Sequence, residues 1–202
     1  MDVMNHGVSI CLIFLLTSGA QSLDQDSILT KYYDAKEIQQ MQTVLHFFDT
    51  YVIENCQDSK DTSVCYQQYF DRLSASDSLD IEIPFEEQRT LYLKKITPAL
   101  FHDIWVYSPG QRRMKDGSLQ YYNAIDYNPS GKYRAFLEDV AKAEPYFKKY
   151  VEPITTAGDL SPSLYRGFAF DPNGLDFNDE RHRLILAIHF LTVNDRLATQ
   201  PK

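Results

Sequence analysis

The chain has 202 residues, of which 44% are hydrophobic and 13% aromatic, and its formal net charge is −8. This composition is typical of one folded domain and excludes a disordered chain, because enough apolar surface is available to form a core. Lys and Arg occur in runs of two at most, so a nucleic-acid partner, which needs a clustered basic face, is not expected.

The first 20 residues have the pattern of a signal peptide. Residues 8–16 form a mostly apolar run, and Ser18 and Ala20 fit the −3 and −1 positions of a cleavage site ahead of Gln21. The run is shorter than the roughly 20 residues that a membrane span needs. One feature departs from the pattern, since no Lys or Arg precedes the run. We predict an exported protein, secreted or periplasmic, whose mature chain has no membrane span; the alternative is a buried N-terminal helix.

Two cysteines, Cys56 and Cys65, follow the predicted signal. In an exported chain an even pair most simply forms a disulfide. A zinc site would need two more soft ligands at suitable spacing, and none follows. We therefore predict a disulfide between these two residues, with free thiols as the alternative.

Residues 21–33 are interpreted as an N-terminal extension that leads into a single helical domain over residues 34–198. From Asp34 onward, apolar residues recur every three or four positions up to Val52, which predicts a helix that ends near Asn55. A polar stretch then leads to a second helix with the same spacing. Its apolar positions are Tyr66, Tyr69, Phe70 and Leu73. Two helices joined in this way predict an antiparallel hairpin that the cysteine pair closes.

The next stretch combines an extended segment with two helices. Leu79, Ile81 and Ile83 alternate with acids, which indicates a short strand or an extended packing segment. A charged helix is predicted over residues 85–96. Thr97-Pro98 then begins another helix, because Thr is a favourable N-cap and Pro is favourable at the first helical position.

Turn-forming residues divide the stretch after this helix. Ser108-Pro109-Gly110 is expected to stop the helix, and Asp116-Gly117 is a turn signal. Residues 119–125 alternate weakly between apolar and polar side chains, so a strand is an option there. Asn128-Pro129 repeats the cap-plus-proline pattern and predicts the start of another helix.

The last helix is predicted to lie in the core. Pro145 and Ser161-Pro162 begin two helices before it, and Asn178 is expected to cap it. Apolar residues cover every side of this last helix, whereas a surface helix would show a polar stripe. Its central residues are therefore expected to be almost fully buried; these are Ile185, Ile188 and Leu191.

His189, on the same helix, is expected to be buried and neutral at pH 7. One ring nitrogen should bond to a backbone carbonyl or a tyrosine hydroxyl, because buried polar groups need partners. Taken together, the helical stripes predict a mainly α fold. We expect a single-domain irregular bundle of about six to eight helices, and the pattern allows one small strand pair.

Three residues are candidates for acid–base chemistry: His102, Asp103 and His182. A histidine beside a carboxylate is a minimal acid–base element, although adjacent residues on a helix point about 100° apart and need not cooperate. His182 lies in the first turn of the last helix and is expected to be exposed. His182 and His189 are seven residues apart, about 10 Å along a helix, so one metal ion cannot join them.

Two further motifs are candidate binding sites. Tyr121 and Tyr122 could stack on a ligand, but such tyrosines more often cover the edge of a core. The residues from Asp171 to Gly174 precede further acids, as in a calcium loop, yet the fifth and sixth positions hold Leu175 and Asp176. A type I turn is predicted instead, and no metal or cofactor is expected.

The sequence contains no catalytic or nucleotide-binding motif from which to name an activity. The leading hypothesis is a non-enzymatic role, in which the chain binds a protein or a small ligand of unknown identity. The alternative is a hydrolase acting on cell-envelope or glycan material through one of the carboxylates or histidines. Whether the chain is an enzyme is left open.

The signal peptide gives a first testable prediction. We expect the mature chain to begin at Gln21, or at Leu23 if Ala20 and Ser22 serve as the −3 and −1 residues. Intact-mass analysis of the exported protein distinguishes the two sites. A full-length chain retained in the cytoplasm would contradict the prediction.

Overall fold

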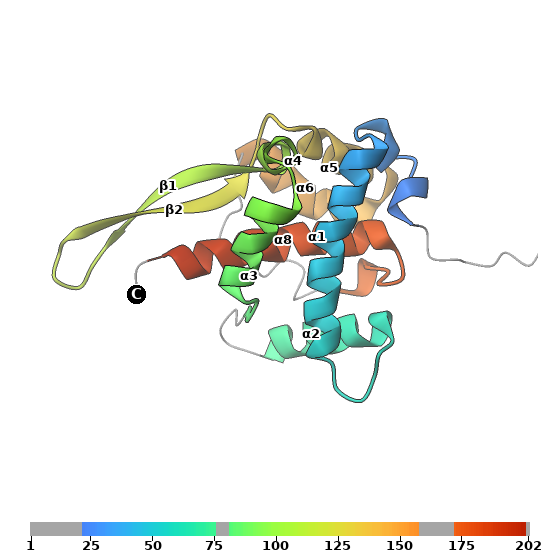
Figure 1. The fold of residues 1–202 in the computed structure, drawn as a ribbon, viewed down its shortest axis with the longest axis horizontal. Coiled ribbons are helices and arrows are strands. Elements are labelled where there is room, and N and C mark those ends of the chain that lie inside the picture. The colour runs from blue at the N-terminus through green and yellow to red at the C-terminus, as the bar shows by residue number, and fades with distance from the viewer. Residues whose placement is uncertain (1–21, 76–80, 158–171, 201–202) are drawn as a thin grey trace, which may run out of the picture.

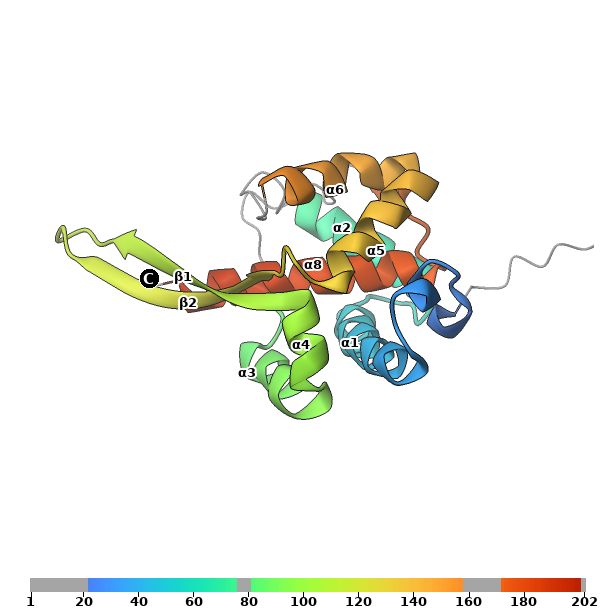
Figure 2. The ribbon, with the colours of Figure 1, turned by 90° about the horizontal axis from the view of Figure 1, so that it is seen from above.

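A buried helix, α8 (Glu180–Thr199), lies at the centre of the molecule, and the other helices pack around it (Figures 1 and 2). The computed structural model describes residues 22–75, 81–157 and 172–200. The predicted signal peptide and the Ser161-Pro162 helix start therefore lie outside the described residues, as does Asp171.

The described residues contain seven α-helices and one pair of strands. Besides α8, the elements are α1 (Ala35–Glu54), α2 (Thr62–Ala75), α3 (Phe85–Thr90), α4 (Pro98–Ile104), β1 (Trp105–Arg113), β2 (Leu119–Tyr127), α5 (Lys132–Ala143) and α6 (Pro145–Ala157). A π-helical turn, Leu91–Lys95, continues α3, and short 3-10 turns lie at Leu23–Gln25, Leu29–Lys31 and Pro172–Gly174. The predicted mainly α fold with a small strand pair is confirmed.

Burial of α8 on all sides follows the prediction. Ile185, Ile188 and Leu191 are fully buried. Aromatic contacts join α8 to its neighbours, and the ring of Phe48 on α1 stacks on Phe190 at 5.8 Å. His189 is also buried, and its Nδ1 lies 3.1 Å from the hydroxyl of Tyr150, one of the two partners predicted for it.

The first helix begins and packs as its sequence indicates. Asp34 and Glu37 form a capping box, in which each side chain accepts a hydrogen bond from the backbone of the other. The buried face of α1 consists of Ile38, Met41, Val44, Leu45, Phe48 and Val52. The preceding segment adds Leu23, Leu29 and Tyr33 to the same core, so the region interpreted as an extension packs against the helices.

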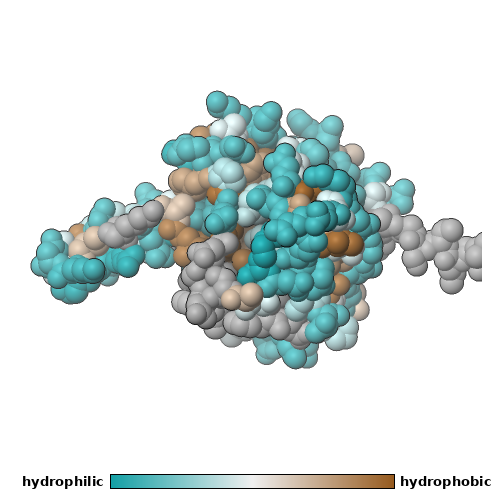
Figure 3. Space-filling model, turned by 90° about the horizontal axis from the view of Figure 1, so that it is seen from below, coloured by the Kyte–Doolittle hydropathy of each residue, from teal (hydrophilic) through white to brown (hydrophobic). Residues whose placement is uncertain are grey.

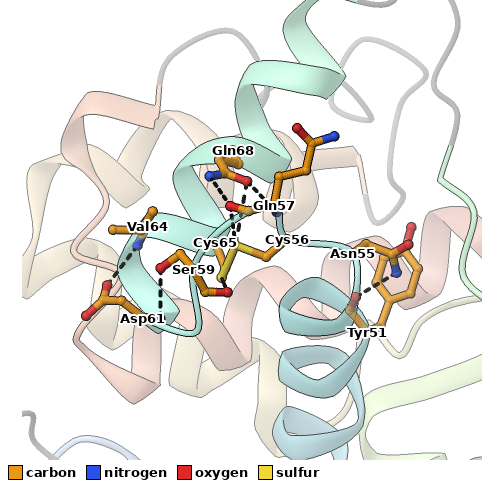
Figure 4. Close-up of a disulfide and its surroundings, with 9 residues drawn as sticks. All are labelled: Tyr51, Asn55, Cys56, Gln57, Ser59, Asp61, Val64, Cys65 and Gln68. Carbon is orange, nitrogen blue, oxygen red and sulfur yellow. Dashed lines mark hydrogen bonds between the residues drawn. A yellow bond between two sulfur atoms is a disulfide. The ribbon is translucent and has the colours of Figure 1, made fainter.

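The disulfide between Cys56 and Cys65 is confirmed, with 5.1 Å between the two Cα atoms (Figure 4). Beside it, Gln68 accepts a hydrogen bond from the Gln57 backbone and donates one back to it. In Figure 1, however, α2 crosses the lower end of α1 instead of running antiparallel along it. The aromatic face of α2 packs on α8 in this arrangement, because the ring of Phe70 meets that of Phe190 on α8 edge-on at 5.9 Å.

The strand pair begins earlier than predicted. The expected helix stop at Ser108-Pro109-Gly110 is wrong, because α4 ends at Ile104 and these three residues lie within β1. Trp105 fits the helical spacing, but its indole Nε1 donates to the Thr192 hydroxyl on α8 at 2.8 Å, and the chain becomes extended there. The turn at Asp116-Gly117 is present, and Gly117 has a φ of +86°, which favours glycine.

Two predicted helix starts are displaced. Asn128-Pro129 forms a turn closed by the Asn128 side chain, and α5 begins at Lys132 after Gly131. Gly131 is required there, because an added Cβ would lie 1.8 Å from the carbonyl oxygen of Asp103. Before α8, the N-cap is Asp179 and not Asn178, since the Asp179 side chain accepts from the Arg181 backbone.

The core position of α8 gives a stability prediction. Ile188→Ala should lower the free energy of unfolding by about 2–5 kcal/mol, because the change leaves a cavity in a packed interior. Chemical denaturation measures the difference. The control, Leu197→Ala, alters an exposed residue near the end of the same helix and should cost less than about 1 kcal/mol. Equal losses in the two variants would contradict a core role for α8.

The disulfide gives a second prediction. Replacing Cys56 and Cys65 together by Ala should lower the stability by about 2.5–3 kcal/mol, because the unfolded chain is then less constrained. Thermal unfolding with and without a reductant provides the measurement. Reductant should destabilise only the parent protein, and an unchanged melting temperature in the double variant would show that the bond has no stabilising role.

Candidate functional site

The predicted pair of His102 and Asp103 does not form an acid–base unit. His102 is exposed, and its ring contacts Phe101 edge-on, with 5.3 Å between centroids. The Asp103 carboxylate instead accepts hydrogen bonds from the Tyr33 hydroxyl and the Lys132 backbone, both at 2.7 Å. Burial and this carboxylate raise the pKa of Tyr33. Asp103 therefore joins the N-terminal segment, α4 and α5.

His182 is buried, so the expectation that it is exposed is wrong. Only 5% of its surface is accessible, because its ring packs edge-on against Phe147 with 4.9 Å between centroids. Its Nδ1 accepts a hydrogen bond from the Asp176 backbone at 2.9 Å. The ring proton is consequently assigned to Nε2, which lies 2.6 Å from Glu144 and donates to it.

A charged cluster surrounds His182 and ties three segments together. Arg181 pairs with Glu144 at 2.6 Å and with the buried Asp26 at 2.8 Å. Glu180 accepts a hydrogen bond from the backbone of Leu23 at 2.9 Å. The N-terminal segment, the start of α6 and the start of α8 are thereby joined. His182 and His102 belong to different elements, and each has its own contacts.

No group of three or more His, Cys, Asp or Glu side chains in the described residues is placed to hold a metal ion. Likewise, no helix in the described ranges has the length and hydropathy that crossing a membrane requires.

Strands β1 and β2 form an arm, residues 105–127, that projects from the helical body (Figures 1 and 2). The last turns of α8 hold its base. Asp195 accepts a hydrogen bond from the Ile125 backbone at 2.9 Å, and Arg196 forms an ion pair with Asp126. Burial raises the pKa of the Asp195 carboxyl, although the bond from Ile125 and the charge of Arg89 oppose the shift. The arm is thus attached to the most buried helix.

One face of the arm carries an exposed apolar stripe, which consists of Tyr107, Leu119 and Tyr121. The antiparallel register places alternate residues of each strand on one face, and pairs Gln111 with Tyr121 and Arg113 with Leu119. The exposed fractions are 60% for Tyr107, 45% for Leu119 and 73% for Tyr121.

Tyr122 lies on the opposite face of the arm. Its ring covers Gly110, where an added Cβ would lie 2.4 Å from the ring. Tyr121 and Tyr122 therefore do not form one stacking platform, although the sequence presents them as a doublet. Tyr121 is available for contacts, whereas Tyr122 packs within the arm.

A hollow of about 230 Å³ lies where the arm joins the body. Tyr107 and Ile125 line it from the arm, Tyr92 and Leu93 from the π-helical turn, and Asp195 from α8. Leu93 is 68% exposed. Viewed from below, the surface is mostly hydrophilic, and hydrophobic residues gather where the arm meets the body (Figure 3). Tyr107 at the base of the arm and Leu93 of the body thus line the same hollow.

A larger groove, about 480 Å³ in volume, lies between α1 and α3 with its π-helical turn. Its lining residues are Thr43, His46, Phe47, Thr50, Tyr51, Glu54, Pro84, Glu87, Thr90, Leu91 and Lys95. The residues from α1 form a second stripe beside the buried one, at positions that the helical period alone assigns to the outer part of the helix. A π-helical turn is uncommon and frequently marks a functional position, which is the one local signal that points here.

Comparisons with protein-family models, curated proteins and solved structures found no match to this chain.

The contact between Glu144 and His182 has a defined pH dependence. Burial opposes ionisation of the Glu144 carboxyl, but the bonds and charges of His182 and Arg181 outweigh it and lower the pKa. Folding therefore favours the carboxylate. Its stabilising effect is complete above the pKa of unfolded Glu, about 4.3, and is lost as the pH falls through the lower folded pKa.

We expect Glu144→Gln to lower the stability at pH 7 by about 1–2 kcal/mol, because a charge-assisted hydrogen bond is lost. Denaturation from pH 7 down to pH 3 should show the difference from the parent protein shrinking below about pH 4.3. Glu152→Gln, at an exposed position of α6, is the control and should follow the parent curve. A difference that is constant with pH would rule out the ionic contribution.

Proposed function

We propose that this chain is an exported binding protein and that the arm is the surface that contacts its partner. The observation that carries the proposal is the exposed apolar stripe on an element that projects from the body. Large exposed side chains are costly in water when they are contiguous, and such patches mark interaction sites in soluble proteins.

The composition of the arm suits a protein partner. Tyr and Arg are enriched among the residues that dominate interface energies, and the arm carries Tyr107, Tyr121 and Arg113 on one face. A two-stranded arm also presents backbone groups along its outer edges, to which an extended segment can add as a strand. Anchorage by Asp195 and Arg196 lowers the entropy that the base of the arm would lose on binding.

Charge defines the chemistry of the partner further. The tip of the arm carries Arg112, Arg113 and Lys115. The one acid there is Asp116, whose carboxylate accepts hydrogen bonds from Ser118 within the turn. A protein with an acidic surface around an apolar recess would complement this tip.

Binding is favoured over the alternative of a hydrolase because two of the three catalytic candidates, Asp103 and His182, are engaged by other protein groups, and the exposed His102 has no carboxylate partner in Asp103. Asp103 is held by Tyr33 and Lys132, and His182 by Glu144 and Asp176. A catalytic pair needs a nucleophile or base within hydrogen-bond reach of a substrate, and these side chains face protein groups.

Site-specific cross-linking tests the proposal. A photo-reactive residue at position 121, in protein expressed in its native exporting cells, should give one discrete adduct. Leu119→Ser should reduce its yield, and raised salt should reduce it further, because the tip is charged. Neither the photo-reactive residue at position 121 nor Leu119→Ser should alter the melting temperature, since both positions are exposed.

The matched control places the same photo-reactive residue at Lys148, an exposed position of α6. The same adducts from both positions would contradict the proposal that the partner binds at the arm. A light-scattering measurement of the purified protein then separates a foreign partner from a second copy of this chain.

A further inference from the structure

The groove between α1 and α3 has the length of a short extended molecule. At one end, Gln40 on α1 accepts a hydrogen bond from the Thr97 backbone at 2.6 Å. At the other, Tyr51 is hydrogen-bonded to the backbone of Glu82. The helices therefore run antiparallel, and the lining from Thr43 to Glu54 extends about 16 Å along α1.

The floor of the groove is apolar, and its size is that of a small-molecule site. Phe47 and Tyr51 from α1 face Pro84 and Leu91 from the opposite side. The volume of about 480 Å³ lies in the range of roughly 300–1,000 Å³ that is typical of small-ligand sites. A protein interface of standard size would need a much larger and flatter surface.

Opposite charges mark the two ends of the groove. Lys95 lies at the end near Thr43 and His46, whereas Glu54 and Glu87 lie toward the end near Pro84. Among the described residues, Lys95 has no carboxylate within ion-pair distance, so its ammonium is available to an anion. The two carboxylates repel an anion from the far end, and the ligand orientation is thereby fixed.

We propose that this groove binds a small amphiphile, an unbranched apolar chain that ends in a carboxylate. The chain lies on Phe47, Tyr51 and Leu91, where burial of its methylene groups supplies most of the affinity. The carboxylate lies at Lys95, at the end of the groove that Thr43 and His46 also line. This site is separate from the arm and does not depend on the function proposed for it.

Calorimetric titration of the purified mature protein with dodecanoate, below its micelle concentration, tests the site. Dodecanoate is about as long in extended form as the groove. Dodecylamine has the same chain with the opposite charge, so its binding should not weaken when Lys95 is replaced by Ala. Lys95→Ala should weaken dodecanoate binding about fivefold, the effect of losing one partly exposed ion pair. Lys94→Ala is the matched control, because Lys94 is the adjacent exposed lysine and lies outside the lining.

A second variant tests binding in the groove by blocking it sterically, without a change of charge. Thr50→Trp should fill the groove and abolish dodecanoate binding while the circular dichroism spectrum stays that of the parent. Tyr121→Ser on the arm should leave dodecanoate binding unchanged. The proposal is overturned if dodecanoate does not bind, if Lys95→Ala weakens dodecylamine as much as dodecanoate, or if Lys95→Ala and Lys94→Ala have equal effects on dodecanoate.

Discussion

The burial of α8 on every side is the constraint on which the rest of the structure depends. A helix without a polar face is stable in water only when other elements enclose it completely, because each exposed apolar side chain would forfeit its burial free energy. Helices α1, α2, α3 and α6, together with the base of the arm, supply this enclosure. Positions such as Ile185 and Ile188 are consequently fully buried.

Because α8 is enclosed, its polar side chains are buried as well. Their hydrogen bonds specify the positions of the elements that pack on α8. Asn194 donates to the side chain of Gln88 on α3 at 2.7 Å, and Gln88 in turn donates to the carbonyl of Leu191 at 2.8 Å. Thr192 accepts from Trp105 at the start of β1. A displaced neighbour would leave these buried groups unpaired, at about 1–3 kcal/mol each, so apolar packing alone does not determine the arrangement.

The local spacing of residue types in the sequence predicts many of the helices but does not predict the contacts between residues far apart in the chain. The periodic stripe predicted α1, the run of apolar residues on every side predicted the buried α8, and the cysteine pair predicted the disulfide, because each depends on neighbouring residues. The end of α4 and the burial of His182 depend on Thr192 and Glu144, partners 87 and 38 residues away in the chain. Of the site residues, Tyr121 was a candidate from the sequence, but the doublet pattern did not distinguish the exposed Tyr121 from Tyr122, which packs within the arm. The groove could not, because its two walls lie about 40 residues apart in the sequence and neither is distinctive alone.

The two proposed binding surfaces, the arm and the groove, are both held in place by α8. Both lie on elements that touch α8 but are not part of it: the arm is bonded to Asp195 and Arg196, and the groove runs between helices whose other faces pack on α8. A rigid core that holds exposed elements in place reduces the entropy lost when a ligand binds. In this arrangement the residues that stabilise the fold differ from those on the proposed binding surfaces. Substitutions at Ile188 act on the whole fold, whereas Tyr121 and Lys95 are exposed, so that a change at either position leaves the core intact.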